Sequence, residues 1–164
     1  MEHKVIDNFL SKKEFNILYN NIFNIDNEFP WFFYEAKELE KDPTKDLNQY
    51  QFCHVFYPSQ SRFFYLLQPL IKKLKIKHLL RIKMNLNPYS SLLSKGQFHI
   101  DMENCTTAIF YLNTNNGYTL FEKNHKKIKS EKNRVLIFNS NLKHTGTNTT
   151  NKKFRGVINL NYVI

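Results

Sequence analysis

The sequence FHIDM at residues 98–102 is followed closely by TTAIFYLN at residues 106–113, and the predicted fold is built around these two stretches. Successive side chains of an extended strand point to opposite faces, so His99 and Asp101 share one face and their apolar neighbours share the other. An imidazole and a carboxylate two residues apart can occupy adjacent positions on one metal ion. The pattern therefore predicts a strand that carries two metal ligands.

A third ligand is expected from the stretch NLKHTGT at residues 141–147, which contains His144. Two histidines and one carboxylate on one side of an iron leave the opposite side open, as in non-haem Fe(II) oxygenases. His125 competes for this role, but it lies in a run of cations that would repel a metal ion, so His144 is favoured. His54 could bind a metal in principle, but it is more simply interpreted as a half-buried strand residue.

The composition is that of a folded protein with few flexible linkers. Of the 164 residues, 41% are hydrophobic and 15% aromatic, but only 4 are glycine and 5 proline. This length suits a single domain, 1–164, with a support region at 1–80 and a core at 81–164. Two cysteines are too few for a disulfide scaffold, and no stretch reads as a signal peptide or a membrane span. We therefore expect a cytoplasmic location and no membrane partner.

The net charge of +10 would suit nucleic acid or another anionic surface. However, the chain is rich in Lys, Asn and Ile, and that composition also arises from AT-rich coding. The charge is therefore weak evidence for any partner.

The first 80 residues predict two helices among short strands. Ser11 and Glu14 have the spacing of a capping box, and apolar residues follow with helical periodicity. A second helical pattern covers 61–75, where Pro69 is expected to cause a kink. The same region predicts extended segments at 5–10, 31–34 and 51–57, and a polar loop at 38–48.

From Arg81 onward, apolar and polar residues alternate with a period of two, which predicts strands with one apolar face. A half-exposed sandwich would give the same alternation. The helices that precede these strands need an apolar partner, so we expect the polar faces to line a lumen, as in a jelly roll. Thr107, Tyr111 and Arg155 would then share the lumen with the two ligands. A further strand is expected at 117–122, and a hairpin from 126–129 and 134–139.

These residues together resemble the Fe(II)- and 2-oxoglutarate-dependent oxygenase superfamily, specifically its prolyl 4-hydroxylase-like branch. The similarity runs from about Arg81 to the C-terminus, and the opening at 5–11 with its helix also resembles the start of that branch. The resemblance implies a mainly β protein with N-terminal helices (α+β) around a double-stranded β-helix, or jelly-roll, core. It also implies that His99, Asp101 and His144 are the catalytic metal ligands.

The resemblance also implies a cosubstrate site. Arg155 follows His144 at close to the family's spacing for the residue that binds the distal carboxylate of 2-oxoglutarate, and Thr107 and Tyr111 match positions that flank the cosubstrate. The implied cofactor and cosubstrates are Fe(II), 2-oxoglutarate and O2, with ascorbate allowed as an addition. Two departures are the single glycine before Tyr118, where a pair is usual, and an asparagine before proline at 87–88, where a tyrosine is common.

The implied function is a dioxygenase that hydroxylates a C–H bond of a prolyl or other peptide residue and releases succinate and CO2. Hydroxylation is favoured over halogenation because Asp101 occupies the position that halide-transferring relatives leave small. A small-metabolite hydroxylase is an alternative. A nucleic-acid demethylase is not favoured, because Asn161 stands where that branch carries a second arginine.

A jelly-roll binding module without turnover is the alternative from another class. It is disfavoured because the three ligands and Arg155 are all retained. The substrate and the oligomeric state cannot be read from the sequence. We expect the segments 38–48 and 88–95 to act as lids that determine the substrate.

Overall fold

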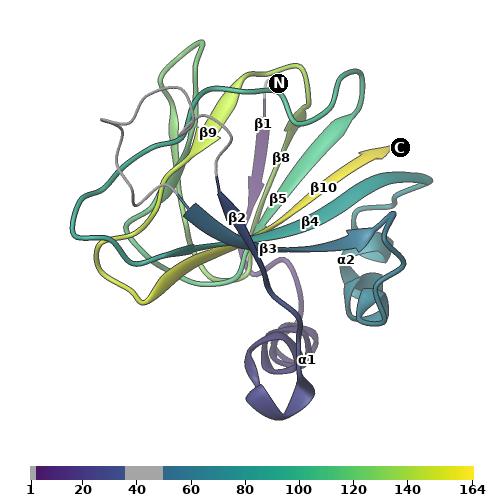
Figure 1. The fold of residues 1–164 in the computed structure, drawn as a ribbon. Coiled ribbons are helices and arrows are strands. Elements are labelled where there is room, and N and C mark those ends of the chain that lie inside the picture. The colour runs from purple at the N-terminus through teal and green to yellow at the C-terminus, as the bar shows by residue number, and fades with distance from the viewer. Residues whose placement is uncertain (1–2, 36–49) are drawn as a thin grey trace.

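The structure of the chain, a computed structural model, describes residues 3–35 and 50–164. It is mostly β, with a large antiparallel sheet, a smaller sheet and two short α-helices among the described residues, consistent with a jelly roll (Figure 1). The loop predicted at 38–48 lies outside the described residues. Within them, no helix is long and apolar enough to cross a membrane.

Within the described residues the large sheet has seven strands, all paired antiparallel, with β10 at its centre. In spatial order its strands are β1 (His3–Ile6), β8 (Arg134–Asn139), β5 (Thr106–Tyr111), β10 (Phe154–Val163), β4 (His78–Pro88), β3 (Tyr50–Tyr57) and β2 (Phe32–Glu35). The small sheet has three antiparallel strands, in the order β7 (Lys127–Lys129), β6 (Tyr118–Phe121) and β9 (His144–Gly146). The helices lie on the side of the large sheet away from β9 (Figure 1).

Helix α1 (Lys12–Phe23) begins where the sequence predicts it. The Ser11 hydroxyl accepts a hydrogen bond from the Glu14 backbone N–H, and the Glu14 carboxylate accepts one from the Ser11 N–H, so both capping-box bonds are present. The apolar stripe is buried through its residues Phe15, Leu18 and Ile22. A single 3₁₀ turn, η1 (Ile25–Asn27), follows the helix.

The second predicted helix is shorter and less regular than its apolar pattern suggested. A 3₁₀ segment, η3 (Phe64–Leu67), leads into α2 (Gln68–Lys73), with Pro69 in the first turn of α2. Proline has no N–H to donate, and only the first turn of a helix leaves that donor unused. Pro69 therefore begins the α-helix instead of kinking a longer one.

Two apolar clusters divide the interior. The larger lies between the helices and the large sheet, where α1 and α2 cover the apolar faces of β4, β5 and β10 through residues such as Met84, Phe110 and Ile158. The smaller lies on the opposite face of the large sheet, and includes Tyr111 of β5 and Phe121 of β6. The predicted alternation is thus confirmed for these strands, but apolar side chains fill part of the predicted lumen.

Two predicted elements are wrong. The hairpin from 126–129 and 134–139 does not form, because β7 pairs with β6 in the small sheet while β8 pairs with β5 and β1 in the large one. The turn between them crosses from one sheet to the other. The stretch 98–102 is also not a regular strand, since His99 forms only an isolated antiparallel bridge with His144 before the chain bends at Asp101.

Candidate functional site

A cavity of about 460 Å³ lies between the two sheets. The large sheet contributes a row of inward-facing side chains from β4 and β10, and the small sheet contributes residues of β6 and β9. The loop at 94–99 closes one side through its bridges to 144–147. Ser94 and Lys95, which fall in the predicted lid 88–95, line this cavity.

The three predicted metal ligands meet in this cavity. One potential ligand atom from each of His99, Asp101 and His144 can be chosen so that all lie within 4.8 Å of one another. The His99 Nε2 lies 3.6 Å from Asp101 Oδ1, and the His144 Nε2 lies 3.7 Å from Asp101 Oδ2. Ligand atoms in adjacent positions on one ion, each about 2.1 Å from it, lie roughly 3 Å apart. Small side-chain adjustments would therefore let the three atoms share an ion.

Backbone contacts orient both imidazoles. The Nδ1 atoms of His99 and His144 lie 3.0 and 3.1 Å from the carbonyl oxygens of Gln97 and Leu142, each two residues earlier. A carbonyl only accepts, so in the neutral ring these contacts place the proton on Nδ1 and leave the Nε2 lone pair on the side of Asp101. This is the tautomer that a metal requires at Nε2.

The charges of the site favour an ionised carboxylate. Burial alone would raise the pKa of Asp101, whose side chain is 8% exposed, but the His99 hydrogen bond and the charges of Arg81 and His144 lower it to about 2. Burial lowers the pKa of His144 and so favours its neutral form. The nearby Asp101 carboxylate raises the pKa of His99, because it accepts a hydrogen bond from Nε2 when the ring is protonated.

Arg81 of β4 holds one side of the carboxylate. Its Nη2 donates to Asp101 Oδ1 at 2.9 Å, and its Nε donates to the side-chain oxygen of Asn161 at 3.2 Å. The other oxygen, Asp101 Oδ2, is buried and has no hydrogen-bond partner among the described residues. Because a buried acceptor without a partner is costly, Oδ2 is the atom best suited to a bound cation.

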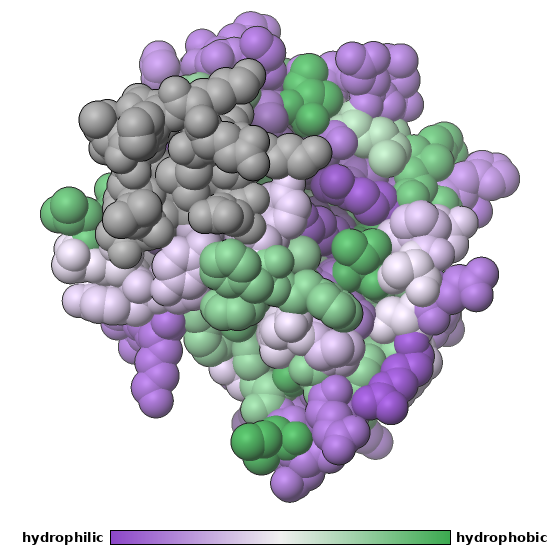
Figure 2. Space-filling model, viewed as in Figure 1, coloured by the Kyte–Doolittle hydropathy of each residue, from purple (hydrophilic) through white to green (hydrophobic). Residues whose placement is uncertain are grey.

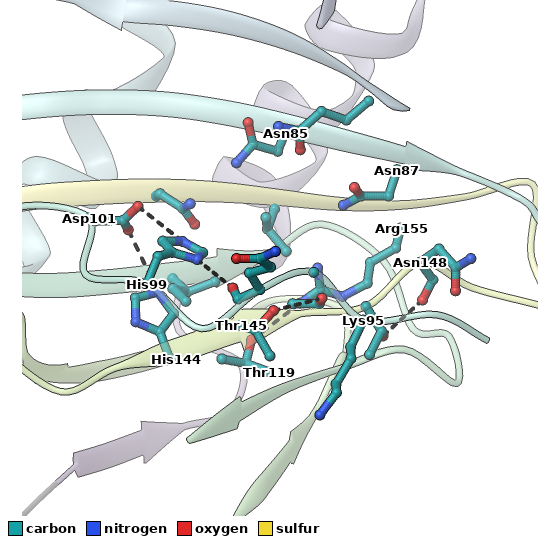
Figure 3. A pocket seen from close by; sticks show the side chains of 18 of the residues that line it. Asn85, Asn87, Lys95, His99, Asp101, Thr119, His144, Thr145, Asn148 and Arg155 are labelled. Atoms are coloured by element: carbon teal, nitrogen blue, oxygen red, sulfur yellow. Dashed lines mark hydrogen bonds and ion pairs between the residues drawn. The ribbon is translucent and has the colours of Figure 1, made fainter. Parts of the chain in front are cut away.

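Arg155 of β10 lies toward the other end of the cavity (Figure 3). Its side chain is buried, with the residue 3% exposed, and it donates from Nε to Ser130 Oγ at 2.8 Å and from Nη2 to Thr119 Oγ1 at 3.2 Å. No carboxylate among the described residues forms an ion pair with it. A buried cation of this kind carries a large desolvation cost, so the site is suited to an anion.

Two glycines give this guanidinium its space. A Cβ at Gly117 would lie 2.6 Å from the Arg155 Cδ, and one at Gly146 would lie 3.1 Å from its Nη1. Gly117 is the single glycine that remains where the resemblance led us to expect a pair.

Tyr111 and Thr107 are placed differently from the other predicted site residues. Neither is among the described residues that line the cavity. The Tyr111 hydroxyl donates to Thr119 Oγ1 at 2.8 Å, and the Thr107 hydroxyl accepts from the Asn161 amide at 3.0 Å. Both residues thus contact polar side chains at or beside the cavity, while the second apolar cluster fills the space that the predicted lumen gave them.

The competing histidines lie elsewhere. His125 sits in an exposed turn and is not part of the cluster of potential ligands. His54 is buried among aromatic rings, where its two ring nitrogens contact the Pro30 carbonyl and the Ser61 hydroxyl. Neither geometry resembles a metal site.

Several residues that line the cavity or hold Arg155 were not predicted as site residues. Thr119 and Ser130 give no sequence signal, because ordinary hydroxyl residues occur throughout the chain. Arg81 and Asn85 do give a sequence signal, since they alternate with apolar residues on a strand whose other face is buried. Which of the polar residues on that face reach the ligands depends on strand register.

The fold is shared with solved oxygenase structures over nearly the whole chain. No protein-family model and no curated protein matches the sequence. A prolyl hydroxylase from Trichoplax adhaerens, in complex with a peptide fragment of the oxygen degradation domain of hypoxia inducible factor, superposes with a TM-score of 0.71 and 17% identity, covering 99% of this chain and 83% of that one.

Two further structures extend the comparison. The viral collagen prolyl hydroxylase of Paramecium Bursaria Chlorella virus-1, in its 2OG complex, has a TM-score of 0.64 and 17% identity and covers 100% of this chain and 97% of that chain. HygX from Streptomyces hygroscopicus, with nickel and 2-oxoglutarate bound, has a TM-score of 0.65 and 11% identity, and the match covers 99% of this chain and 82% of that chain. The resemblance read from the sequence is thus confirmed at the level of the fold, which is that of the prolyl hydroxylases and other 2OG-Fe(II) oxygenases.

Proposed function

We propose that this chain, as one domain spanning 1–164, is an Fe(II)- and 2-oxoglutarate-dependent dioxygenase that hydroxylates a C–H bond of a prolyl or other peptide residue. One observation carries the proposal: a single cavity holds the cluster of His99, Asp101 and His144 at one end and the buried Arg155 guanidinium toward the other (Figure 3). A cation site and an anion site in one cavity suit a metal ion and a cosubstrate that chelates it.

The three clustered side chains fit a ferrous ion. Two neutral imidazole nitrogens and one carboxylate oxygen form the donor set of non-haem Fe(II) sites, which leaves positions open for other ligands. Both Nε2 atoms already face Asp101, whose Oδ2 lacks a partner among the described residues. Arg81 donates a hydrogen bond to the other carboxylate oxygen, Oδ1, so we infer that Asp101 would bind the metal through Oδ2 only.

The surroundings of Arg155 fit the distal carboxylate of 2-oxoglutarate. A guanidinium can grip a carboxylate with two parallel hydrogen bonds, and burial strengthens such a pair. Thr119 Oγ1 accepts hydrogen bonds from both Arg155 and Tyr111, so its own proton is free to point into the cavity that it lines. We therefore assign to Thr119 the donor role toward the cosubstrate, with Tyr111 orienting it from behind.

When bound, the iron and 2-oxoglutarate supply the oxidising chemistry, with succinate and CO2 as products. The residues of this chain supply placement and the exclusion of water. Ser130 and Thr119 fix the Arg155 side chain, Arg81 fixes Asp101, and the apolar cluster beside Tyr111 seals the cavity from one side.

A peptide is the favoured substrate. The Trichoplax adhaerens structure of the same fold holds a peptide fragment. In this chain, Tyr34 of β2 lines the cavity, and its neighbours Phe32 and Phe33 are each 60% exposed. Figure 2, which has the same view as Figure 1, shows apolar surface near the middle of the molecule, where β2 lies in Figure 1. Exposed apolar surface beside a cavity is typical of an interaction site.

Formation of succinate tests the proposal. The purified protein is incubated with Fe(II), 2-oxoglutarate and labelled O2, together with separate pools of peptides, nucleic acids and metabolites. We expect peptide-stimulated succinate formation and a product that gains one labelled oxygen atom, even with excess chloride present. Asp101→Ala is expected to abolish both signals. Succinate formation that persists in Asp101→Ala, or a chlorinated main product, contradicts the proposal.

A further inference from the structure

Lys83 is a cation in the cavity that forms no ion pair with any of the described residues. It belongs to the inward-facing row of β4, two residues from Arg81, and its Nζ lies 4.5 Å from the centroid of the Tyr34 ring. Among the described residues, no carboxylate lies within 4.0 Å of its nitrogen, whereas Arg81 is paired with Asp101. The Tyr34 ring thus positions an ammonium group whose charge no carboxylate of the described residues neutralises.

Among the described residues, the charges that line the cavity are mostly positive. The described residues contribute Arg81, Lys83, Lys95 and Arg155, against one carboxylate from Asp101. Under the proposed function, the charge of Arg81 neutralises that of Asp101. The charges of a ferrous ion and of 2-oxoglutarate cancel each other, and Arg155 faces the distal carboxylate of 2-oxoglutarate. The described lining of the loaded cavity therefore keeps an excess of positive charge, which favours an anionic substrate group.

Two amide oxygens beside Lys83 also lack hydrogen-bond partners among the described residues. The Oδ1 atoms of Asn85 and Asn159 are buried and accept no hydrogen bond from the described residues, although both side chains line the cavity. Asn159 is 8% exposed and lies directly opposite Lys83 in the pairing of β10 with β4. A buried amide oxygen without a donor is costly, so these atoms are suited to a ligand that brings N–H groups.

We propose that the cavity takes an acidic peptide segment, with a substrate carboxylate paired to Lys83 and a peptide N–H donated to Asn159 or Asn85. This inference rests on the proposed function and adds the chemical class of its substrate. A peptide supplies both the carboxylate and the N–H donor within one residue. Because a prolyl nitrogen carries no hydrogen within a peptide, the N–H comes from a residue other than the prolyl target, and the aspartyl or glutamyl residue that supplies the carboxylate can also supply it.

The test compares peptides that differ only in charge. A peptide array with a central proline and every residue type at the flanking positions is probed with protein loaded with Mn(II), as an inert metal, and 2-oxoglutarate. Binding of the best Asp- or Glu-containing peptides is then measured against their Asn or Gln counterparts. N-acetylglutamate N-methylamide, which offers the same groups without a peptide, is measured in parallel.

We expect wild type to favour the acidic peptides by about tenfold or more, as for a partly buried charge-assisted pair. Lys83→Met should lose this preference and Lys83→Arg should keep it. Lys127→Met is the matched control, because Lys127 also stacks on a tyrosine ring, at 4.7 Å from the centroid of Tyr118, but is not among the residues that line the cavity. It should bind peptides as wild type does.

Equal binding of acidic and amide peptides, or a preference that survives in Lys83→Met, overturns the inference. Binding of the small amide without binding of any peptide overturns the assignment to a peptide. Absence of Mn(II) or 2-oxoglutarate binding would count against the proposed function. If both bind and the charge preference is missing, only this inference fails.

Discussion

Replacing Arg155 by methionine separates binding of the cosubstrate from stability of the fold. Methionine keeps much of the length of the side chain and removes its charge and its donors. The buried guanidinium has neutral hydroxyl partners, Ser130 and Thr119, and no carboxylate partner among the described residues. In wild type, the protein therefore bears the cost of a buried charge that no carboxylate of the described residues offsets and that a bound anion would offset.

The expected loss of affinity follows from the bonds that disappear. Two charge-assisted hydrogen bonds to a carboxylate are worth about 1.5 kcal/mol or more each, so the affinity for 2-oxoglutarate should fall roughly a hundredfold. The ligand-free protein should change little, because the relieved burial of charge offsets the lost bonds to the two hydroxyls. We expect its free energy of unfolding to stay within about 1 kcal/mol of wild type.

Calorimetric titration of Mn(II)-loaded protein with 2-oxoglutarate measures the affinity, and urea denaturation of the ligand-free protein measures stability. Arg155→Lys keeps the charge but loses the fork geometry, so its affinity should be intermediate. Arg134→Met is the control, since Arg134 pairs with Asp7 and Glu131 and is not among the residues lining the cavity. An Arg155→Met protein that binds 2-oxoglutarate within threefold of wild type would refute the reasoning.

Three further predictions concern the stability of the fold. Gly117→Ala places a Cβ 2.5 Å from the Asn148 carbonyl oxygen and 2.6 Å from the Arg155 Cδ, so urea denaturation should show a loss of about 1–3 kcal/mol, and calorimetry a weaker affinity for 2-oxoglutarate. Burial raises the pKa of Tyr162 to about 12, so the protonated form stabilises the fold below pH 10 and this contribution is lost as the pH rises toward 12. Tyr162→Phe should therefore lose less stability than wild type over that pH range in denaturant titrations. Phe110→Ala should lower the free energy of unfolding by about 3–5 kcal/mol in urea, because Phe110 is fully buried in the larger apolar cluster.

Local patterns in the sequence predicted much of the fold. The capping box at Ser11 and the stripe that follows it specify α1, because both depend only on residues within three turns. The alternation after Arg81 specifies which face of β4, β5 and β10 is apolar, because side-chain direction in a strand has a period of two. These signals require no knowledge of which strands are neighbours.

Strand pairing was not predictable in the same way. The turn between Lys129 and Arg134 resembles a hairpin locally, yet the strands on either side belong to different sheets. A short connection brings strands close without deciding whether they share hydrogen bonds. The stretch 98–102 was predicted as a strand, but only His99 finds a partner there, through its bridge to His144.

The candidate site shows the same limit. The sequence contains residue types that bind a metal ion and an anion, and the structure brings His99, Asp101 and His144 together. The alternation of side chains along β5 also placed Tyr111 toward the lumen. Alternation along one strand does not show that Phe121 and its neighbours fill that part of the space. The contact between Tyr111 and Thr119 depends on how the two sheets pack, which no short-range pattern records.

The most direct test of the central claim is the visible spectrum of the protein with Fe(II) and 2-oxoglutarate in the absence of oxygen. A 2-oxo acid chelated to Fe(II) in a protein site gives a charge-transfer absorption that neither component gives alone. We predict that this absorption appears and saturates at one Fe(II) per chain, and that it is missing in Asp101→Ala. No absorption in wild type, or equal absorption in Asp101→Ala, would contradict the assignment of these residues to an iron and 2-oxoglutarate site.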